Sequence, residues 1–496
     1  MGNNSFNNKN NNIDTNNIVQ EVWNYCNVLR DDGFSYQDYL EQLTYLLFLK
    51  MEDESQTNSG KIKIPHKLGW QNLRKLSGEE LEKQYRNILE ELGKMSNSVG
   101  TIYKNAESKF KKPARLERLV KLIDGKTWLE MGVDKKGEIY EGLLQKNAED
   151  VKSGAGQYFT PRELIKVMVE VMKPKPGITI NDPACGTGGF LLAAYNFITK
   201  NYSLNPRQKK FLSKDVLSGT DIAEDVARLC LMNLFLHGIG NDESPIKVDD
   251  ALLSDSPVLH DMVLTNPPFG KKSSYTVTSK DGKVSKEVDS YERDKFWVTT
   301  SNKQLNFVQH VKSLLKDTGK AAVVVPDNVL FEGGAGETVR RKLLETCDVH
   351  TLLRLPTGLF YAQGVKANVL FFDNKPGSKD PWTKKLWIYD FRTNKHFTLK
   401  QNQLRYEDLE DFIECYNPQN RHQRKESERF RAFKYEELIQ RDKISLDIFW
   451  LKDDSLEDSE NLPDPDTLAQ EISDNLESAQ HQFQSMLNDF ENISFD

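Results

Sequence analysis

The middle of the chain alternates short apolar runs with helical stretches, and this alternation constrains the fold more than any other feature. The runs are rich in β-branched residues and occupy residues 178–180, 216–219, 246–248, 262–264, 321–325, 349–355 and 368–372. Strands that alternate with helices form βαβ units, in which helices cover a parallel sheet. The pattern therefore predicts an α/β domain with a largely parallel sheet.

The flanking segments follow other patterns, which divide the chain into four parts. Residues 1–17 are rich in Asn and are expected to form a disordered lead. Residues 18–150 carry apolar residues at helical spacing, which predicts an all-helical N-terminal domain. A Gly-containing joint begins the α/β domain, for which we expect the bounds 151–415. Residues 416–496 form a C-terminal extension.

One amphipathic helix is predicted over 466–490 in that extension. Its apolar residues keep intervals of three and four positions: Leu468, Ile472, Leu476, Ala479, Phe483, Met486 and Phe490. The helix either packs back onto its own domain or docks a partner's helix. A basic run between residues 109 and 121 is also open to two interpretations, a solvated helix face or a contact with phosphate groups.

Composition excludes several classes of protein. No stretch approaches about eighteen consecutive apolar residues, so we expect no membrane association. The five cysteines lack paired spacing, which favours reduced thiols in a cytoplasmic protein without a metal site. The formal net charge of −7 argues against a chain that coats nucleic acid by itself. If DNA is involved, a local patch or a partner must supply much of the binding.

Unusual residues follow four of the predicted strands. A Gly-rich turn over 182–190 follows the first strand and opens a helix, where free backbone N–H groups are available. Asp221 follows the second strand, Asp250 the third, and an Asn-Pro-Pro-Phe sequence at 266–269 the fourth. Because ligands bind beyond the carboxyl ends of the strands in doubly wound sheets, these residues predict one binding site.

The Gly-rich turn does not match a dinucleotide-binding motif. Leu191 occupies the place of the third glycine, and Asp182 at the mouth of the turn would repel a pyrophosphate. A cationic nucleoside fits better, and S-adenosylmethionine is the obvious candidate. Its amino group suits Asp182, its ribose suits Asp221, and its adenine suits the residues that follow Asp250.

The Asn-Pro-Pro-Phe sequence offers hydrogen-bond acceptors on a rigid frame. Pro267 and Pro268 lack N–H groups and end the strand ladder, which leaves the Asn266 amide and nearby carbonyls without ladder partners. Phe269 adds an aromatic face beside them. A planar group that bears an amine needs both features, although a plain strand end with a Pro-Pro turn would show the same residues.

Three motifs together resemble the N6-adenine DNA methyltransferases, and most closely the modification subunit of type I restriction–modification systems. They are Gly-Gln-Tyr-Phe-Thr-Pro-Arg at 156–162, the Gly-rich turn at 182–190, and Asn-Pro-Pro-Phe at 266–269, in the order of that family. The similarity extends to residues 137–141, 319–326 with 330–331, and 358–372. The resemblance implies a Rossmann-like, S-adenosylmethionine-dependent methyltransferase sheet, preceded by an all-helical domain and followed by a C-terminal helical segment.

The resemblance also assigns roles to residues. It implies catalytic roles for Asn266, Pro267, Pro268 and Phe269. It implies no metal, and contacts to S-adenosylmethionine from Gln157, Tyr158, Phe159, Thr160, Pro161, Arg162, Asp182, Pro183, Ala184, Cys185, Gly186, Thr187, Gly188, Gly189, Asp221, Ile222, Asp250 and Ala251. The family often carries Glu at the ribose position, so Asp221 is a departure by one methylene.

The implied activity is methyl transfer to the N6 amine of an adenine in double-stranded DNA. The N6 lone pair is delocalised into the ring, so acceptors at the Asn266 side chain and the Pro267 carbonyl would hold both N–H protons and favour a pyramidal nitrogen. Phe269 would stack on an adenine that has been flipped out of the duplex. The loop over 271–300 mixes lysines with aromatic residues, which suits either a cover for that base or a disordered insertion.

Nothing after residue 375 has the size or the basic character of a target-recognition domain. We therefore expect a separate DNA-specificity subunit to choose the site, with two copies of this chain docked through the N-terminal domain and the helix over 466–490. A restriction subunit with nuclease and translocase activity is a further candidate partner. A methyltransferase of another planar amide, such as protein glutamine, and a methylation-inactive DNA-binding scaffold are the alternatives.

Overall fold

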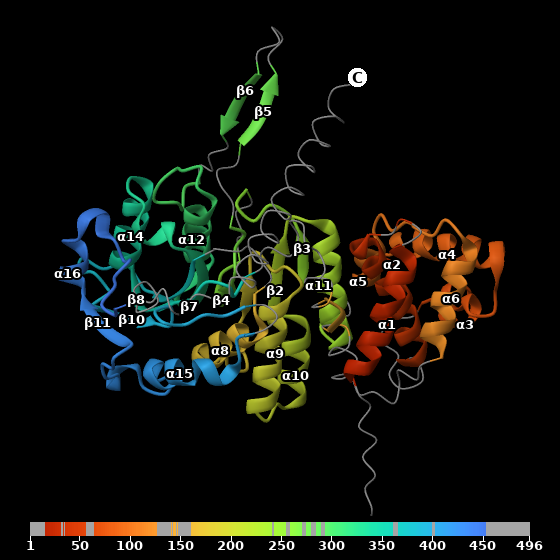
Figure 1. Ribbon diagram of the computed structural model, residues 1–496, viewed down its shortest axis with the longest axis horizontal. Helices are drawn as coiled ribbons and strands as arrows, with labels where there is room; N and C mark the ends of the chain where they lie inside the picture. The colour runs from red at the N-terminus through yellow and green to blue at the C-terminus, as the bar shows by residue number, and fades with distance from the viewer. Residues whose placement is uncertain are drawn as a thin grey trace, which may run out of the picture. The chain divides into compact units, whose positions relative to one another are not determined.

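The computed structural model describes residues 15–30, 33, 35–55, 64–125, 140, 142–144, 146, 160–240, 243–253, 258–269, 274–278, 284–288, 293–360, 366–398 and 402–452. These residues form two compact units (Figure 1). The first contains residues 1–150 and 228–244, and the second contains 151–227 and 245–496. Gln157, Tyr158, Phe159, most of the Asn-rich lead and the predicted helix over 466–490 lie outside the described residues.

The first unit is helical. Its helices are α1 (Thr15–Arg30), α2 (Tyr36–Ser55), α3 (Trp70–Leu73), α4 (Gly78–Gly93), α5 (Ser98–Tyr103) and α6 (Pro113–Asp124). Local signals explain two of their starts: Asn97 caps α5 by accepting from the backbone N–H groups of Val99 and Gly100, and Pro113 occupies the first turn of α6.

The second half of α11 (Glu224–Leu236) also belongs to the helical unit, although it lies far along the chain. Leu231, Met232 and Leu236 share one buried core with the helices α1 to α6. Arg228 forms an ion pair with Glu41 and donates to the carbonyl of Lys104 at 2.8 Å. A division of the chain at residue 150 alone therefore does not describe this unit.

The second unit is built on a nine-stranded sheet in the order β11-β10-β8-β9-β7-β4-β1-β2-β3. Its strands are β1 (Ile180–Asp182), β2 (Leu217–Asp221), β3 (Ile246–Val248), β4 (His260–Thr265), β7 (Leu315–Pro326), β8 (Cys347–Arg354), β9 (Ala367–Asn374), β10 (Lys385–Asp390) and β11 (Phe430–Lys434). Strands β3, β2, β1, β4 and β7 are parallel, whereas β9 is antiparallel to both β7 and β8. The α/β class predicted from the sequence is confirmed.

Helices cover both faces of this sheet. In Figure 1, α8 (Arg162–Met172), α9 (Gly189–Asn201) and α15 (Glu410–Tyr416) lie along one face, and α12 (Lys303–Ser313) and α14 (Ala335–Thr346) lie along the other. Within the described ranges, this unit also contains the α-helices α10 (Pro206–Lys214), α13 (Asn328–Phe331) and α16 (Tyr435–Ile439). A hairpin of β5 (Ser274–Thr278) and β6 (Val284–Val288) occupies part of the 271–300 loop. Strand β11 continues the sheet beyond residue 415, where the sequence pattern placed the end of the catalytic domain.

Two buried arginines, Arg340 of α14 and Arg354 of β8, hold the chain that follows α16. Arg340 donates to the carbonyls of Lys443 and Ile444 at 2.6 and 3.0 Å, and both of these residues adopt a left-handed backbone with φ near +50°. Arg354 donates to the Ile448 carbonyl at 2.5 Å. We call residues 443–450 the C-terminal strap. A β-branched residue in the left-handed region is strained, so the arginine contacts must hold this turn in place.

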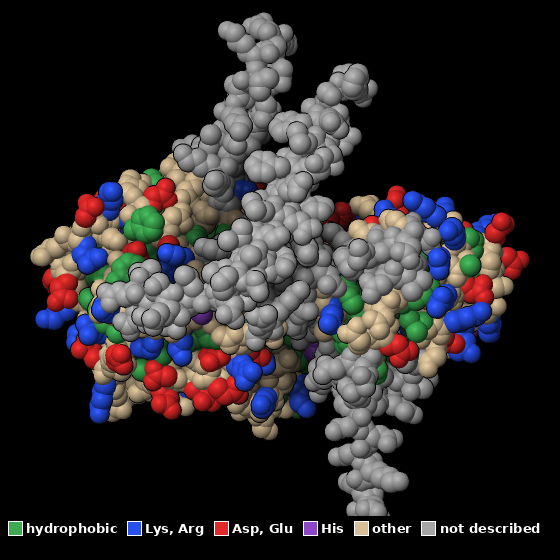
Figure 2. All heavy atoms as spheres, viewed as in Figure 1, with side chains coloured by type: hydrophobic (Ala, Val, Ile, Leu, Met, Phe, Trp, Pro, Cys, Tyr) green, Lys and Arg blue, Asp and Glu red, His purple; other side chains and the backbone are tan. Residues whose placement is uncertain are grey.

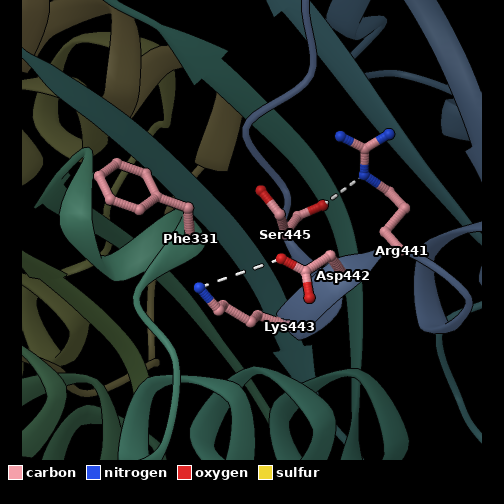
Figure 3. Close-up of a pocket in the computed structure, with 5 residues that line it drawn as sticks. All are labelled: Phe331, Arg441, Asp442, Lys443 and Ser445. Carbon is pink, nitrogen blue, oxygen red and sulfur yellow. Dashed lines mark hydrogen bonds and ion pairs between the residues drawn. The ribbon is translucent and has the colours of Figure 1, made fainter.

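A cavity of about 410 Å³ lies at the start of the strap (Figure 3). Its lining residues are Phe331, Arg441, Asp442, Lys443 and Ser445, and Arg441 donates to the Ser445 carbonyl at 2.7 Å. None of the site residues predicted from the sequence lines it. No helix in the described ranges has the length and apolar character needed to cross a membrane.

Candidate active site

The strand order creates a switch point beside β1. From β1 the chain moves outward through β2 to β3, and then returns to the other side of β1 as β4. The register sets Asp182 of β1 opposite Gly219 of β2, and Asp221 of β2 opposite Val248 of β3. Because the four strands are parallel, the loops that follow them leave from one edge of the sheet.

The Gly-rich turn after β1 has the backbone that glycine permits. Gly186 and Gly188 have φ values of +53° and +83°, and Gly188 precedes the first residue of α9. The Gly186 N–H donates to Oδ2 of Asp221 at 3.0 Å, which ties the turn to the end of β2. The Arg162 guanidinium lies directly against Gly189, where an added Cβ would be 2.5 Å from Nη1.

Two carboxylates lie at this edge, of which Asp182 is buried and Asp221 is half-buried. Asp182 is 1% exposed, and its Oδ1 accepts from the backbone N–H of Ala184 at 3.1 Å. Burial raises the pKa of Asp182 to about 7, and the negative charge of Asp221 adds to the rise. Burial also raises the pKa of Asp221, although its Oδ1 accepts from the Ala223 N–H at 3.0 Å. The edge therefore favours a cationic ligand.

The third loop forms an apolar shelf beside these acids. Asp250 turns back onto its own loop, where Oδ1 accepts from the Leu252 N–H at 2.9 Å. Leu252 is buried in a small cluster with Phe307, and Ala184, Ala251 and Phe296 pack against it. Ile222, at the end of β2, is 70% exposed.

The fourth loop places the Asn-Pro-Pro-Phe residues at the same edge. Asn266 is 8% exposed, and its Nδ2 donates to the Thr160 hydroxyl at 2.8 Å. Pro267 is buried, Pro268 is exposed and Phe269 is half-buried. The rings of Phe269 and Phe360 meet edge to face, with 5.8 Å between their centroids.

Sequence reasoning missed three features of this arrangement. The sequence predicted that Thr160 contacts the cofactor, whereas in the structure its hydroxyl accepts a hydrogen bond from Asn266. Phe360 lies within a segment of family resemblance but received no role, because its contact with Phe269 joins loops that are far apart in the sequence. Arg293 was also missed: its guanidinium lies 4.9 Å from the Phe296 ring centroid and donates to the His310 ring at 3.0 Å.

In the described part of the chain, no group of three or more His, Cys, Asp and Glu side chains could hold a metal ion.

Comparisons with known proteins identify the family of this chain. The family described as N-6 DNA Methylase matches residues 132–452, and the HsdM N-terminal domain matches residues 18–125. The methylase subunit of the type I restriction enzyme StySPI from Salmonella potsdam is 37% identical over 513 residues, covering 94% of each chain. The crystal structure of the EcoKI M protein, an enzyme of Escherichia coli K12, covers 96% of each chain at 32% identity and a TM-score of 0.53.

A modification subunit of a putative type I restriction enzyme from Vibrio vulnificus supports the fold. Its structure has a TM-score of 0.66 at 21% identity and covers 86% of this chain and 92% of its own. Since the family match covers more than half of the chain and the relatives match over nearly its whole length, this chain belongs to the N6-adenine DNA methyltransferases, as a methylase subunit of type I restriction enzymes.

Proposed function

We propose that the edge formed by the loops after β1, β2, β3 and β4 binds S-adenosylmethionine and a flipped adenine, and that the Asn-Pro-Pro-Phe residues are catalytic. The observation that carries this proposal is the convergence of four chemically distinct loops at one switch point of the sheet. Asp182, Asp221 and Asn266 are carried there by neighbouring strands.

The acids at this edge fit the cofactor. Buried Asp182 with a pKa of about 7 gains most from a positively charged amino group, which would restore its ionised form. The Asp221 oxygens accept backbone N–H groups, including those of Gly186 and Ala223, and a carboxylate has lone pairs enough to accept a ribose hydroxyl as well. Exposed Ile222 and the shelf around Leu252 suit an adenine ring. When bound, S-adenosylmethionine supplies a methyl group that its sulfonium has already activated.

The Asn-Pro-Pro-Phe residues suit the N6 amine of adenine, which is the nucleophile. The Asn266 side-chain oxygen and the Pro267 carbonyl would accept hydrogen bonds from the two N6–H groups, which directs the nitrogen lone pair toward the cofactor site. The N–CH3 bond would form as the S–CH3 bond of the sulfonium breaks, and one N6 proton would then be released to water. Phe269 provides a ring for stacking, and Phe360 supports that ring from its edge. Since the amine of a paired adenine cannot be reached inside the duplex, the substrate base is flipped out of double-stranded DNA.

Site selection requires a partner in this proposal. On the face drawn in Figure 2, the coloured Lys and Arg side chains are interspersed with Asp and Glu. The coloured side chains on this face form no concentrated basic surface, and the formal net charge of −7 likewise argues against a chain that binds DNA alone. A DNA-specificity subunit with two copies of this chain supplies the missing contacts, and a restriction subunit joins that complex.

Three substitutions test the site, with the chain assembled with its specificity subunit. Asn266→Ala and Phe269→Ala should abolish methyl transfer to DNA and leave S-adenosylmethionine binding largely intact by isothermal titration. Asp182→Ala should reverse the pattern, with the binding defect dominant. Asn196→Ala and Asp215→Ala are matched controls, because both side chains are exposed and lie away from the loops. Full methylation by Asn266→Ala would refute the catalytic assignment.

A further inference from the structure

The segment before α8 reaches two parts of the proposed site at once. Thr160 and Asn266 are both 8% exposed, and the Nδ2 of Asn266 donates to the Thr160 hydroxyl at 2.8 Å. Two positions further on, Arg162 lies against Gly189 at the start of α9. Residues 160–162 therefore lie between the Gly-rich turn and the Asn-Pro-Pro-Phe loop.

The orientation of the Asn266 amide decides what the site can bind. A primary amide presents an acceptor oxygen on one side and two donor hydrogens on the other. The adenine amine is a donor, so it binds only if the Asn266 oxygen faces it. With the amide rotated by half a turn, donors would face donors and the nitrogen lone pair would not be directed.

From this geometry we infer that Thr160 is a positioning residue for methyl transfer, which holds the Asn266 amide with its nitrogen inward and its oxygen toward the target amine. This inference rests on the proposed role of Asn266. The Thr160 hydroxyl accepts in the observed hydrogen bond. Removing it would take this acceptor from a buried amide nitrogen, which costs free energy. The resemblance alone places Thr160 among the cofactor contacts. In that role, its loss would weaken S-adenosylmethionine binding rather than slow methyl transfer.

Thr160→Val separates the two roles, because valine keeps the shape of threonine and removes the hydroxyl. We expect the single-turnover rate of DNA methylation to fall about 10- to 100-fold, as expected when one buried partner is removed. The dissociation constant for S-adenosylmethionine, measured by isothermal titration, should change less than about threefold. Thr160→Ser retains the hydroxyl and should recover most of the rate. Thr199→Val, at an exposed position of α9, is the matched control.

A second readout tests the hydrogen bond without activity. Thr160→Val should lower the thermal unfolding temperature of the otherwise native chain, and it should lower it less when Asn266 is already alanine, because the bond is then absent from both proteins. Equal effects in the two backgrounds would show that the two side chains are not coupled, and would overturn the inference.

The outcomes distinguish this inference from the proposed function. A Thr160→Val defect mainly in S-adenosylmethionine affinity, or no defect at all, overturns the positioning role while Asn266→Ala remains inactive. An equal loss of affinity and rate also overturns it. If Asn266→Ala itself methylates DNA normally, the proposed function has failed, and the positioning role fails with it.

Discussion

Replacing Arg340 with methionine should release the C-terminal strap and lower the free energy of unfolding by a measurable amount. The guanidinium is buried, at 2% exposure, and donates to four backbone carbonyls, those of Val329, Glu332, Lys443 and Ile444. Methionine fills a similar volume and offers no donor. Each hydrogen bond from a charged group is worth about 1.5 to 3 kcal/mol, and some carbonyls will regain water, so we expect a loss of about 3 to 5 kcal/mol.

The strap should respond before the rest of the unit. Lys443 and Ile444 hold left-handed conformations that cost about 1 to 3 kcal/mol each, so the turn relaxes once its donors are removed. Urea unfolding measures the global loss, and amide hydrogen exchange over residues 443–450 measures the local one. Exchange there should accelerate beyond the change at β7 or β9.

Arg341→Met is the matched control. Arg341 is the next residue in α14, and its partially exposed side chain bonds to Glu337 at 3.0 Å. Exposed helix pairs contribute about 0.3 to 0.5 kcal/mol, so this variant should unfold almost as the parent does. A loss below about 1 kcal/mol for Arg340→Met, or one equal to that of Arg341→Met, would refute the reasoning.

Four further predictions concern the active site. The pKa of Asp182 is raised in the folded chain, so the folded state binds more protons than the unfolded state between about pH 4 and 7. The free energy of unfolding should therefore fall as the pH rises through this window. Urea titrations at a series of pH values measure this dependence, and Asp182→Asn should flatten it. A cationic amino group needs ionised Asp182, so calorimetry near pH 6.5 should detect proton release when S-adenosylmethionine binds, and the Asn variant should show none. Gly219→Ala places a Cβ 2.8 Å from the Gly-rich turn and should cost about 1 to 3 kcal/mol and weaken cofactor binding, whereas Gly377→Ala meets no neighbour and should do neither. Phe360→Ala removes the edge-on support of Phe269 and should slow methylation about threefold to tenfold, with unchanged S-adenosylmethionine affinity.

The parallel half of the sheet was predictable because its signals are local. Each of its strands is a short apolar run, and the residues with unusual chemistry stand directly after those runs. The direction of β9 was not predictable, since its composition suits a strand of either direction. Strand β11 pairs with β10 at the sheet edge, and its start lies in a polar, charged stretch that gave no strand signal.

The side-chain contacts of the site were harder to predict than its loops. The Thr160 hydroxyl and the Asn266 amide are 106 positions apart, so no spacing rule connects them. Phe269 and Phe360 come from loops after different strands. Family resemblance located all four residues, but it could not say which of them meet.

The packing of α11 limits where two related chains can recombine. Recombination near residue 150 would join the first 150 residues of one parent to the Arg228–Leu236 segment of another. That segment packs in the core of the helical unit, so the core would combine residues from two parents. Glu41 and Arg228 would then come from different parents, as would Leu231 and its neighbours. A chimera with a single junction should therefore inherit a mismatched core, and a viable exchange needs residues 228–244 to travel with the N-terminal segment.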